Sequence, residues 1–308
     1  MSAGTRVAAV VVTHDRRELL AEALEALAAQ TRPPDAVIVV DNASADGTRD
    51  LVRARFPGAD LLALGVNTGG AGGFAAGIAR ALDAPGTGLI WLMDDDTVPE
   101  PDALAALLDA RDRASWEPAL IASRVVWTDG RDHPMNTPRV KPGASRAELA
   151  AAREIGCRPV RSASFVSVLV DATAVRERGL PVADYFLWND DFEFTTRLLR
   201  GRTGLYCPAS VVVHKTVTFG GTDADPGDRF YYEVRNKLWL FTRSRGLAPA
   251  ERLLYAGSSA RRWARTYFRS RDRATLRRGL REGVRDGLRR GPRPTAEVIS
   301  AAMRHYDP

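Results

Sequence analysis

The feature that most constrains this chain is an apolar run in residues 88–102 that ends in three consecutive carboxylates. Residues 89–93 are predicted to form a strand buried on both faces, because short continuous apolar runs are typical of parallel sheets covered by helices. Asp94, Asp95 and Asp96 then lie at the carboxyl end of that strand. Open α/β sheets bind their ligands at this edge, so we expect the chain to be organised around it.

Three adjacent carboxylates repel one another unless water or a divalent cation separates them. Alternate side chains of an extended backbone share a face, so Asp94 and Asp96 can share one ligand while Asp95 points the other way. An Asp-x-Asp after a strand therefore favours a site for a metal-bound nucleotide. The alternative is an acidic turn that caps the helix expected at 101–114.

The rest of the chain alternates between short apolar runs and stretches with helical spacing. This alternation predicts an α/β fold with a mostly parallel central sheet covered by helices. Strands are expected at 7–13, 36–41, 60–63, 120–126, 163–170 and 209–215, and helices at 18–30, up to residue 82, 101–114 and 231–241. Residues 128–159 are rich in Gly, Pro and Arg without periodicity, so we expect a long excursion there.

Two further segments carry polar groups to strand ends. Asp41 closes the second strand, where it can bind a ribose or base edge or can merely cap its own loop. Repeated glycines in residues 65–77 precede an alanine-rich helix and allow a phosphate to approach free backbone amides, although a purely structural turn is the alternative. Their spacing and position differ from a Rossmann fingerprint.

A second group of acids opens the helix that begins near residue 190. Asp190, Asp191 and Glu193 lie in its first turn, where the amides and the helix dipole are expected to keep carboxylates ionised, as a general base requires. Ordinary charging of a helix N-terminus is the alternative. His214 ends an apolar strand, and an acid-rich site makes it a candidate metal ligand rather than an ordinary polar residue.

Charge divides the chain into two parts. Residues 243–308 hold 17 arginines and 6 acidic residues, a net charge of +11, and the preceding residues carry −5. We expect a catalytic domain at 1–242 and a basic helical region at 243–308. Residues 261–290 mix arginines with apolar side chains, which suits either an anionic bilayer surface or packing against the catalytic domain.

Composition excludes several classes of protein. No apolar run approaches the length of a membrane span, and residues 7–12 are too short for a signal peptide, so we expect a cytoplasmic protein. Cys157 and Cys207 have no paired spacing, which argues against a disulfide framework or a zinc site and favours reduced, structural cysteines. The arginine-rich region alone would suit nucleic acid, but no segment resembles a recognition module, so no nucleic-acid partner is expected.

Taken in order, these segments resemble the inverting GT-A-fold glycosyltransferases of family 2 over about residues 5–240. The resemblance includes Val-Val-Thr-His-Asp-Arg at 11–16, Asp-Asn-Ala-Ser-Ala-Asp-Gly-Thr at 41–48, the Asp triplet, the later acid cluster and His214. Asn-x-Gly-Gly-Ala-Gly-Gly-Phe at 67–74 and Trp-Asn-Asp-Asp-x-Glu at 188–193 are most similar to actinobacterial galactofuranosyltransferases. Related rhamnosyltransferases share this framework.

The resemblance implies roles for individual residues. Residues implied to lie along a nucleotide-sugar donor are Thr13, Arg16, Asp41, Asn67, Gly69, Gly70, Asp94 and Asp95. Residues implied to hold Mn²⁺ or Mg²⁺ are Asp94, Asp96 and His214. Asp191 would deprotonate the acceptor hydroxyl, while Asp190 and Glu193 would position hydroxyl groups of acceptor or donor.

The implied activity is metal-dependent, inverting transfer of galactofuranose from UDP-galactofuranose to a hydroxyl of a lipid-linked or cell-envelope glycan. Rhamnose transfer from dTDP-rhamnose is the alternative, and a nucleotidyltransferase is a second one, although His14-Asp-Arg-Arg is not the basic glycine loop that such an enzyme would place after its first strand. The chain is shorter than polymerising relatives, which favours single addition. We expect it at the inner face of the plasma membrane, held peripherally through residues 261–290.

Overall fold

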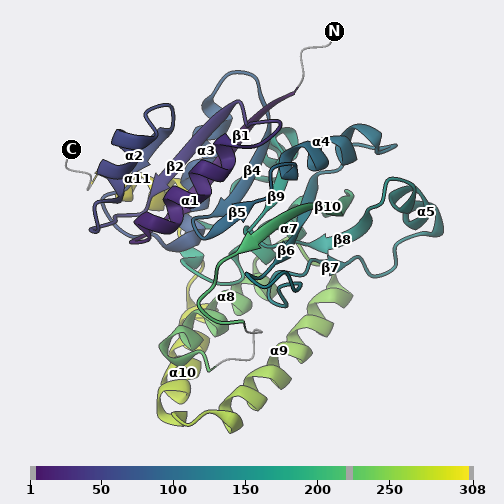
Figure 1. Ribbon diagram of the computed structural model, residues 1–308. Coiled ribbons are helices and arrows are strands. Elements are labelled where there is room, and N and C mark those ends of the chain that lie inside the picture. Colours follow the sequence, from purple (N-terminus) through teal and green to yellow (C-terminus); the bar gives the residue numbers. More distant parts are fainter. Residues whose placement is uncertain (1–4, 220–224, 305–308) are drawn as a thin grey trace.

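The computed structural model describes residues 5–219 and 225–304, which form one mixed sheet with helices on both faces and a helical extension below it (Figure 1). The strands are β1 (Arg6–Thr13), β2 (Ala36–Asp41), β3 (Asp60–Ala63), β4 (Thr87–Asp94), β5 (Thr97–Pro99), β6 (Leu120–Val126), β7 (Arg139–Val140), β8 (Arg158–Ser162), β9 (Val168–Asp171) and β10 (Gly204–His214). The strand order is β3-β2-β1-β4-β9-β6-β10-β8-β7, and β5 pairs with β10.

Helices connect these strands and continue beyond the last one. They are α1 (Arg17–Ala28), α2 (Thr48–Arg55), α3 (Gly69–Asp83), α4 (Ala103–Arg113), α5 (Arg146–Glu154), α6 (Ala172–Arg178), α7 (Asp190–Leu198), α8 (Phe230–Thr242), α9 (Pro249–Arg269), α10 (Arg273–Arg289) and α11 (Thr295–Arg304), with short 3₁₀ turns at Ala183–Tyr185 and Gly227–Arg229. The expected α/β fold and its helical C-terminal region are confirmed.

The β3-β2-β1-β4 half of the sheet is parallel, as predicted. Strand β4 is buried on both faces, because Ile90 and Leu92 pack into one apolar cluster while Trp91 and Met93 pack into the other. The register pairs Thr13 with Asp41 and Val12 with Asp94. The polar ends of these three strands therefore meet at one edge of the sheet.

The other half of the sheet differs from the prediction. Residues 163–170 do not form one strand: β8 ends at Ser162, and β9 begins at Val168 and runs antiparallel to both β4 and β6. The chain turns between them because Ser167 bonds the Trp91 indole and Ser123 within the core. Residues 128–159 are not without regular structure either, since they contain β7 and α5.

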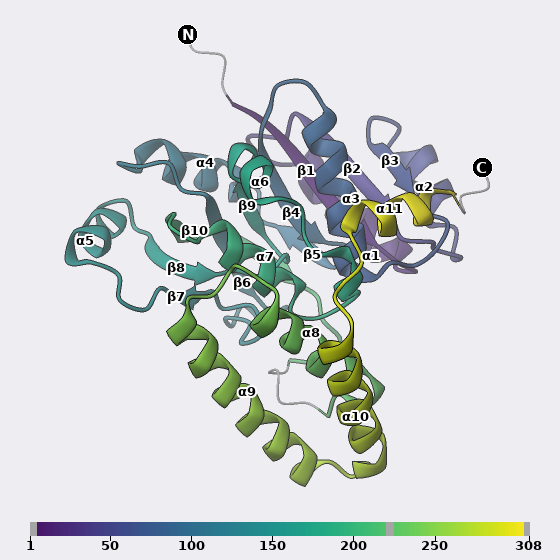
Figure 2. The same ribbon diagram turned by 180° about the vertical axis from the view of Figure 1, so that it is seen from behind.

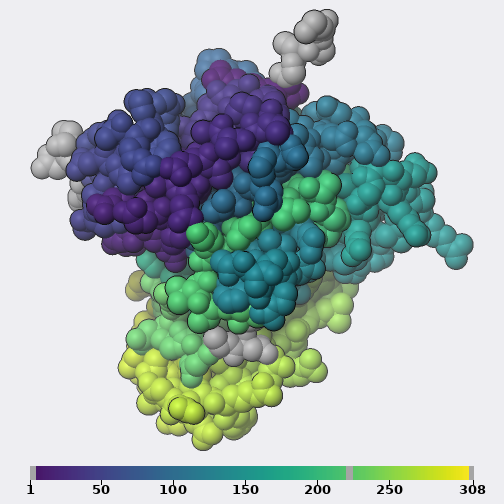
Figure 3. Space-filling view, viewed as in Figure 1, coloured from purple at the N-terminus to yellow at the C-terminus, as the bar shows by residue number. Residues whose placement is uncertain are grey.

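Helices α9 and α10 form the lower part of the molecule (Figure 1 and Figure 3). Helix α10 lies against α8 through a row of small residues: a Cβ atom at Gly283 or Gly287 would come within 2.8 Å of Val234 or Leu238. Most apolar side chains of residues 261–290, from both α9 and α10, pack into one cluster with Phe230, Val234 and Leu238 of α8. These side chains are Trp263, Tyr267, Leu276, Leu280 and Val284. Packing against the preceding chain, one of the two alternatives, therefore accounts for them, whereas Phe268 and Leu288 remain exposed.

After α10 the chain returns to the sheet, where helix α11 lies beside α3 (Figure 2). Val298 packs against Ala75, and the Ala302 carbonyl accepts a hydrogen bond of 2.9 Å from the Gly65 amide. None of the described helices is long and apolar enough to cross a membrane. Cys157 and Cys207 are buried free thiols, as expected.

Candidate active site

Three residues expected to bind metal meet where β4 and β10 end. Asp94, Asp96 and His214 each offer a ligand atom, and these atoms lie within 4.8 Å of one another. The alternation argument assumed that the backbone stays extended through the triplet. Instead, β4 ends at Asp94, and the chain turns into β5, where Thr97 pairs with His214. That turn brings Asp96 to the histidine.

The imidazole of His214 is oriented by a residue that the sequence did not single out. Its Nδ1 lies 2.9 Å from the Asn136 amide oxygen, and its Nε2 lies 3.1 Å from Asp96 Oδ1. Because an amide oxygen only accepts, Nδ1 carries the hydrogen and Nε2 faces the carboxylates. Burial lowers the pKa of His214, but contact with Asp96 more than offsets it and raises the pKa above its ordinary value.

The two carboxylates fit a hard divalent cation. Burial, reinforced by the charge of Asp96, raises the pKa of Asp94 to about 7, whereas contact with His214 outweighs burial and lowers the pKa of Asp96. Asp96 Oδ1 is buried, and among the described residues its near neighbour is the Nε2 atom of His214, itself a potential ligand. Two carboxylates and an imidazole whose ligand atoms converge suit Mn²⁺ or Mg²⁺.

Arg16 sits beside this cluster and partly balances its charge. Its guanidinium donates to Asp95 at 3.1 Å and to Asp96 at 2.8 Å, while half of the side chain remains exposed. Asp95 also accepts a hydrogen bond from the His14 amide at 3.4 Å, and because the same Arg16 nitrogen contacts Asp95 and Asp96, these two carboxylates converge on Arg16 instead of facing opposite sides as the alternation predicts. An exposed arginine at the edge of a carboxylate cluster is placed to contact a phosphate.

The β2 end of the site is held by internal contacts. Asp41 is buried, accepts from the Ser44 amide at 3.3 Å and pairs with Arg49 at 2.6 Å, so capping of its own loop accounts for its contacts. Asn42 links this loop to the glycine segment, because its Nδ2 donates to the Gly69 carbonyl at 2.9 Å. Arg49 and Asn42 were not predicted.

The glycine segment is packed against the loop that precedes α7. Gly69 has φ +67°, and a Cβ atom there would lie 2.0 Å from the Phe186 carbonyl oxygen, which also accepts from the Ala71 amide at 3.1 Å. The Gly69 amide donates to Asn67 Oδ1 at 2.7 Å. Protein acceptors thus occupy two of the amides expected to face a phosphate, while a Cβ at Gly70 would meet open space.

The loop before α7 has an unusual backbone. Phe186, Trp188 and Asn189 have φ values of 67°, 66° and 65°, which non-glycine residues rarely adopt. Such strain persists only where surrounding contacts impose it, and it is frequent at functional sites.

Two side chains of α8 impose this conformation. The buried Asn236 amide donates to the carbonyls of residues 185, 187 and 188 at 2.9, 2.8 and 2.9 Å. Arg235 donates to the carbonyls of residues 184 and 185 at 2.8 and 3.0 Å. Both residues belong to a Tyr-Tyr-x-x-Arg-Asn segment at 231–236, which thus clamps the loop that carries the acids.

The acids of α7 do not all behave as predicted. Burial raises the pKa of Asp190 well above its ordinary value, with the charges of Asp191 and Asp94 adding to the effect. Burial also raises the pKa of Asp191 to about 6, although the Phe192 amide and the charge of Arg139 act against it. The expectation that the helix N-terminus would keep both strongly ionised is therefore wrong, because desolvation outweighs the amides. Asp191 remains partly exposed and titrates within reach of neutral pH.

Glu193 faces the protein interior rather than the site. It pairs with Arg197 at 2.8 Å and accepts from the Ser244 hydroxyl at 2.7 Å, and its side chain is only 2% exposed. These contacts leave no exposed oxygen for a substrate hydroxyl. Glu193 is thus a structural acid, contrary to the role that the resemblance implied.

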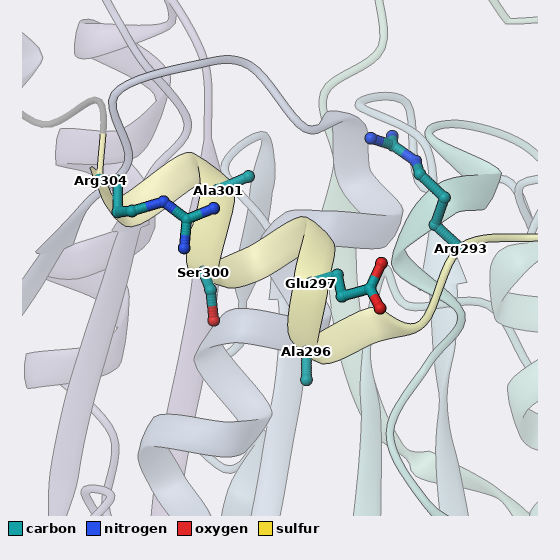
Figure 4. Close-up of a pocket in the computed structure, with 6 residues that line it drawn as sticks. All are labelled: Arg293, Ala296, Glu297, Ser300, Ala301 and Arg304. Carbon is teal, nitrogen blue, oxygen red and sulfur yellow. The ribbon is translucent and has the colours of Figure 1, made fainter.

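A surface hollow elsewhere contains none of these groups. It lies along α11 and is lined by Arg293, Ala296, Glu297, Ser300, Ala301 and Arg304 (Figure 4). The carboxylates and His214 therefore define the candidate site.

Comparison with known proteins identifies this arrangement. The chain is 34% identical over 258 residues to galactofuranosyltransferase GlfT1 of Mycobacterium tuberculosis, covering 77% of this chain and 82% of that protein. It is 48% identical to the GlfT1 of Mycolicibacterium smegmatis over 102 residues, 33% of each chain. It is 29% identical to N-acetylglucosaminyl-diphospho-decaprenol L-rhamnosyltransferase of M. tuberculosis, covering 70% and 77% of the two chains.

Solved structures share the fold at low sequence identity. S. aureus TarS in complex with UDP-GlcNAc matches 96% of this chain and 84% of that chain with a TM-score of 0.62 at 14% identity. GalNAc-T7 with UDP, GalNAc and Mn²⁺ matches 98% and 57% with a TM-score of 0.60 at 13% identity. The family model for glycosyl transferase family 2 matches residues 8–161, which contain the Asp triplet, the loop after β2 and the glycine segment. The chain therefore belongs to glycosyl transferase family 2 and is a glycosyltransferase.

Proposed function

We propose that this enzyme transfers galactofuranose from UDP-galactofuranose, with inversion, to a hydroxyl of a lipid-linked or cell-envelope glycan. The observation that carries the proposal is the meeting of Asp94, Asp96 and His214 at the edge of the sheet where the glycine segment packs against the loop that precedes α7. The choice of sugar rests on the relatives, because the one named for galactofuranose is 34% identical and the one named for rhamnose is 29% identical. Transfer from dTDP-rhamnose is the alternative.

The proposed chemistry uses three groups of residues. Mn²⁺ or Mg²⁺ held by Asp94, Asp96 and His214 would act as a Lewis acid for the leaving diphosphate. Asp191 accepts the proton of the acceptor hydroxyl, since among the acids of α7 it is partly exposed and has a pKa raised to about 6, whereas Asp94 is assigned to the metal. Asp190, whose burial favours the protonated form, donates a hydrogen bond to a sugar oxygen. A single displacement with one base gives inversion at the anomeric carbon.

The nucleotide end is proposed to lie along the parallel strands. Thr13, Asp41 and Arg16 belong to strand ends and a loop that share one edge with Asp94, which supports a nucleoside site there. We assign the donor sugar and diphosphate to the stretch from Asn67 through Gly69 and Gly70, with Asp95 orienting Arg16.

We further propose that residues 1–242 form the catalytic domain and that 243–308 attach it peripherally to the inner face of the plasma membrane. The support is the outward face of α9, where Leu253, Leu254 and Phe268 are 77%, 74% and 68% exposed. The exposed positions of this helix include Arg261 and Arg269 but no Asp or Glu. Apolar and cationic groups on one face suit an anionic headgroup layer.

Thermal stabilisation by nucleotides in the presence of Mn²⁺ tests the donor assignment. A ligand at 100 times its Kd adds about 2.7 kcal/mol to the free energy of unfolding, which shifts Tm by several degrees. We expect UDP and UDP-galactofuranose to stabilise, dTDP-rhamnose to do so less, and a chelator to remove the shift. A larger shift with dTDP-rhamnose would reverse the donor assignment, and no shift with any nucleotide would refute the proposed function.

A further inference from the structure

A cationic cluster lies on the α8–α9 side of the acid loop, and the proposed chemistry does not use it. Its centre is the buried carboxylate of Glu233, which is bonded by Arg262 and the Trp263 indole and lies 3.3 Å from Lys237 Nζ. The other Glu233 oxygen accepts from Asn189 at 3.0 Å, at the start of α7. Two cations thus share one carboxylate directly behind the catalytic loop.

A third cation, Arg139 of β7, extends this cluster towards solvent. Its guanidinium carbon lies 5.6 Å from the ring centre of Phe192 and 5.9 Å from that of Tyr255, so it bridges the first turn of α7 and helix α9. Among the residues that the structure describes, no carboxylate pairs with Arg139 and no acceptor bonds its N–H groups. An arginine held by aromatic rings with unused donors is suited to bind an anion.

The charges of this cluster act on the base itself. Tyr255, which contacts Arg139, lies one turn of α9 before Ser259, which contacts Lys237 Nζ at 3.0 Å, so Arg139 and Lys237 meet neighbouring turns of the same helix. Burial raises the pKa of Asp191, and the charge of Arg139 acts against that rise. Burial lowers the pKa of Lys237, and the charge of Glu233 acts against that fall. The positive charges of Arg139, Lys237 and Arg262 are opposed by the single carboxylate of Glu233, so the cluster has a net positive charge. It lies beside Asp191, which is proposed to accept the proton of the acceptor hydroxyl.

We propose that Arg139, Lys237 and Arg262 form a subsite for a phosphate or diphosphate group of the acceptor. This inference rests on the proposed function, which places the acceptor hydroxyl at Asp191, and it assigns the acceptor an anionic group on the side away from the donor. Arg139 supplies a planar fork that matches phosphate oxygens, and Lys237 supplies a point charge behind it. The exposed Leu253 and Leu254 immediately precede Tyr255 in α9, so an apolar chain attached to the phosphate would leave along that helix.

Calorimetry with farnesyl diphosphate, in EDTA and without donor, tests the subsite. The chelator prevents diphosphate from binding through metal at Asp94 and Asp96, and the assay needs no turnover, so its result is independent of the donor assignment. The test variant is Arg139→Gln, which removes no hydrogen bond that the described residues make. The matched control is Arg281→Gln, which removes an exposed arginine from α10.

We expect Arg139→Gln to raise the Kd of farnesyl diphosphate by about tenfold or more, as for loss of a charge-assisted hydrogen bond, and Arg281→Gln to leave it within twofold. Farnesol should not bind, and inorganic pyrophosphate should bind more weakly than farnesyl diphosphate. If pyrophosphate binds as tightly as farnesyl diphosphate, the anion site stands, but the apolar chain contributes nothing and the bound anion need not belong to a lipid. Equal binding by the wild type and Arg139→Gln, or no binding by the wild type, would overturn the proposal.

Discussion

Replacing Asn236 with alanine tests whether α8 fixes the catalytic loop. The three residues with positive φ in this loop each cost about 1–2 kcal/mol, so the loop stores about 3–6 kcal/mol of backbone strain. Without the Asn236 amide the carbonyl of residue 185 keeps its bond from Arg235, but those of residues 187 and 188 lose this donor, and each carbonyl left unpaired in the interior costs about 1–3 kcal/mol. The clamp and the strain are therefore of similar size, and without the clamp we expect the loop to relax.

The expected result of Asn236→Ala is a loss of kcat by about 100-fold, because a displacement near 1 Å of a catalytic group has an effect of that order. The affinity for UDP with Mn²⁺ should stay near the wild-type value, since the strand-end residues are not altered. Amide hydrogen exchange should increase in residues 186–192. Tyr231→Phe is the matched control, because it removes a hydrogen bond from the same helix to Asp286 and not to the loop. A kcat within twofold of wild type, with unchanged exchange, would refute the reasoning.

Three further predictions concern the metal, the base and the glycine contact. Asp96→Ala should abolish Mn²⁺ binding measured by electron paramagnetic resonance, while Asp60→Asn, which removes a partly exposed acid paired with Arg80, should retain it; retained binding in the first variant would contradict the assigned site. Activity should rise with pH through about 6 as Asp191 loses its proton, and Asp191→Asn should lose transfer but keep UDP affinity; near-normal transfer by that variant would reassign the base. Gly69→Ala should lower the free energy of unfolding in urea by about 2 kcal/mol or more, because φ is positive and a carbonyl lies in the way, whereas Gly70→Ala should cost less than about 1 kcal/mol. Similar values for the two glycine variants would exclude the close contact as the cause.

The sequence predicts that Asp94, Asp96 and His214 belong to one site because two simple rules act together. Buried strands show as apolar runs, and parallel strands bring their carboxyl ends to one edge, so Asp94 could be placed there without knowledge of the tertiary structure. The turn that brings Asp96 to His214 was not needed for that prediction, although the structure depends on it. The same rules could not reveal Asn136, because it reaches His214 from a segment whose pattern has no period.

The errors share another cause, which is burial by distant segments. The sequence predicts that a helix N-terminus keeps Asp190 and Asp191 ionised for catalysis, but burial raises the pKa of both. Glu193 read as a site residue, but Ser244, which is 51 residues away, bonds it from the inside. Asn236 similarly acts on carbonyls 48 to 51 residues away. The local sequence pattern identifies candidate residues, but contacts between segments that are distant in the sequence determine which of these residues face the substrate.

The return of α11 to the sheet has a mechanical consequence for the basic helices. Residues 249–289 leave the globule beside β8, where Arg161 pairs with Glu251, and the chain rejoins it where Ala302 bonds Gly65. The intervening arm is therefore held at both ends and also along its length, where α10 packs on α8 and Arg262 of α9 pairs with Glu233, so it cannot swing out as a free lever. Any force on α9 at a bilayer is transmitted to the antiparallel edge, to α8 behind the catalytic loop and to the start of the glycine segment.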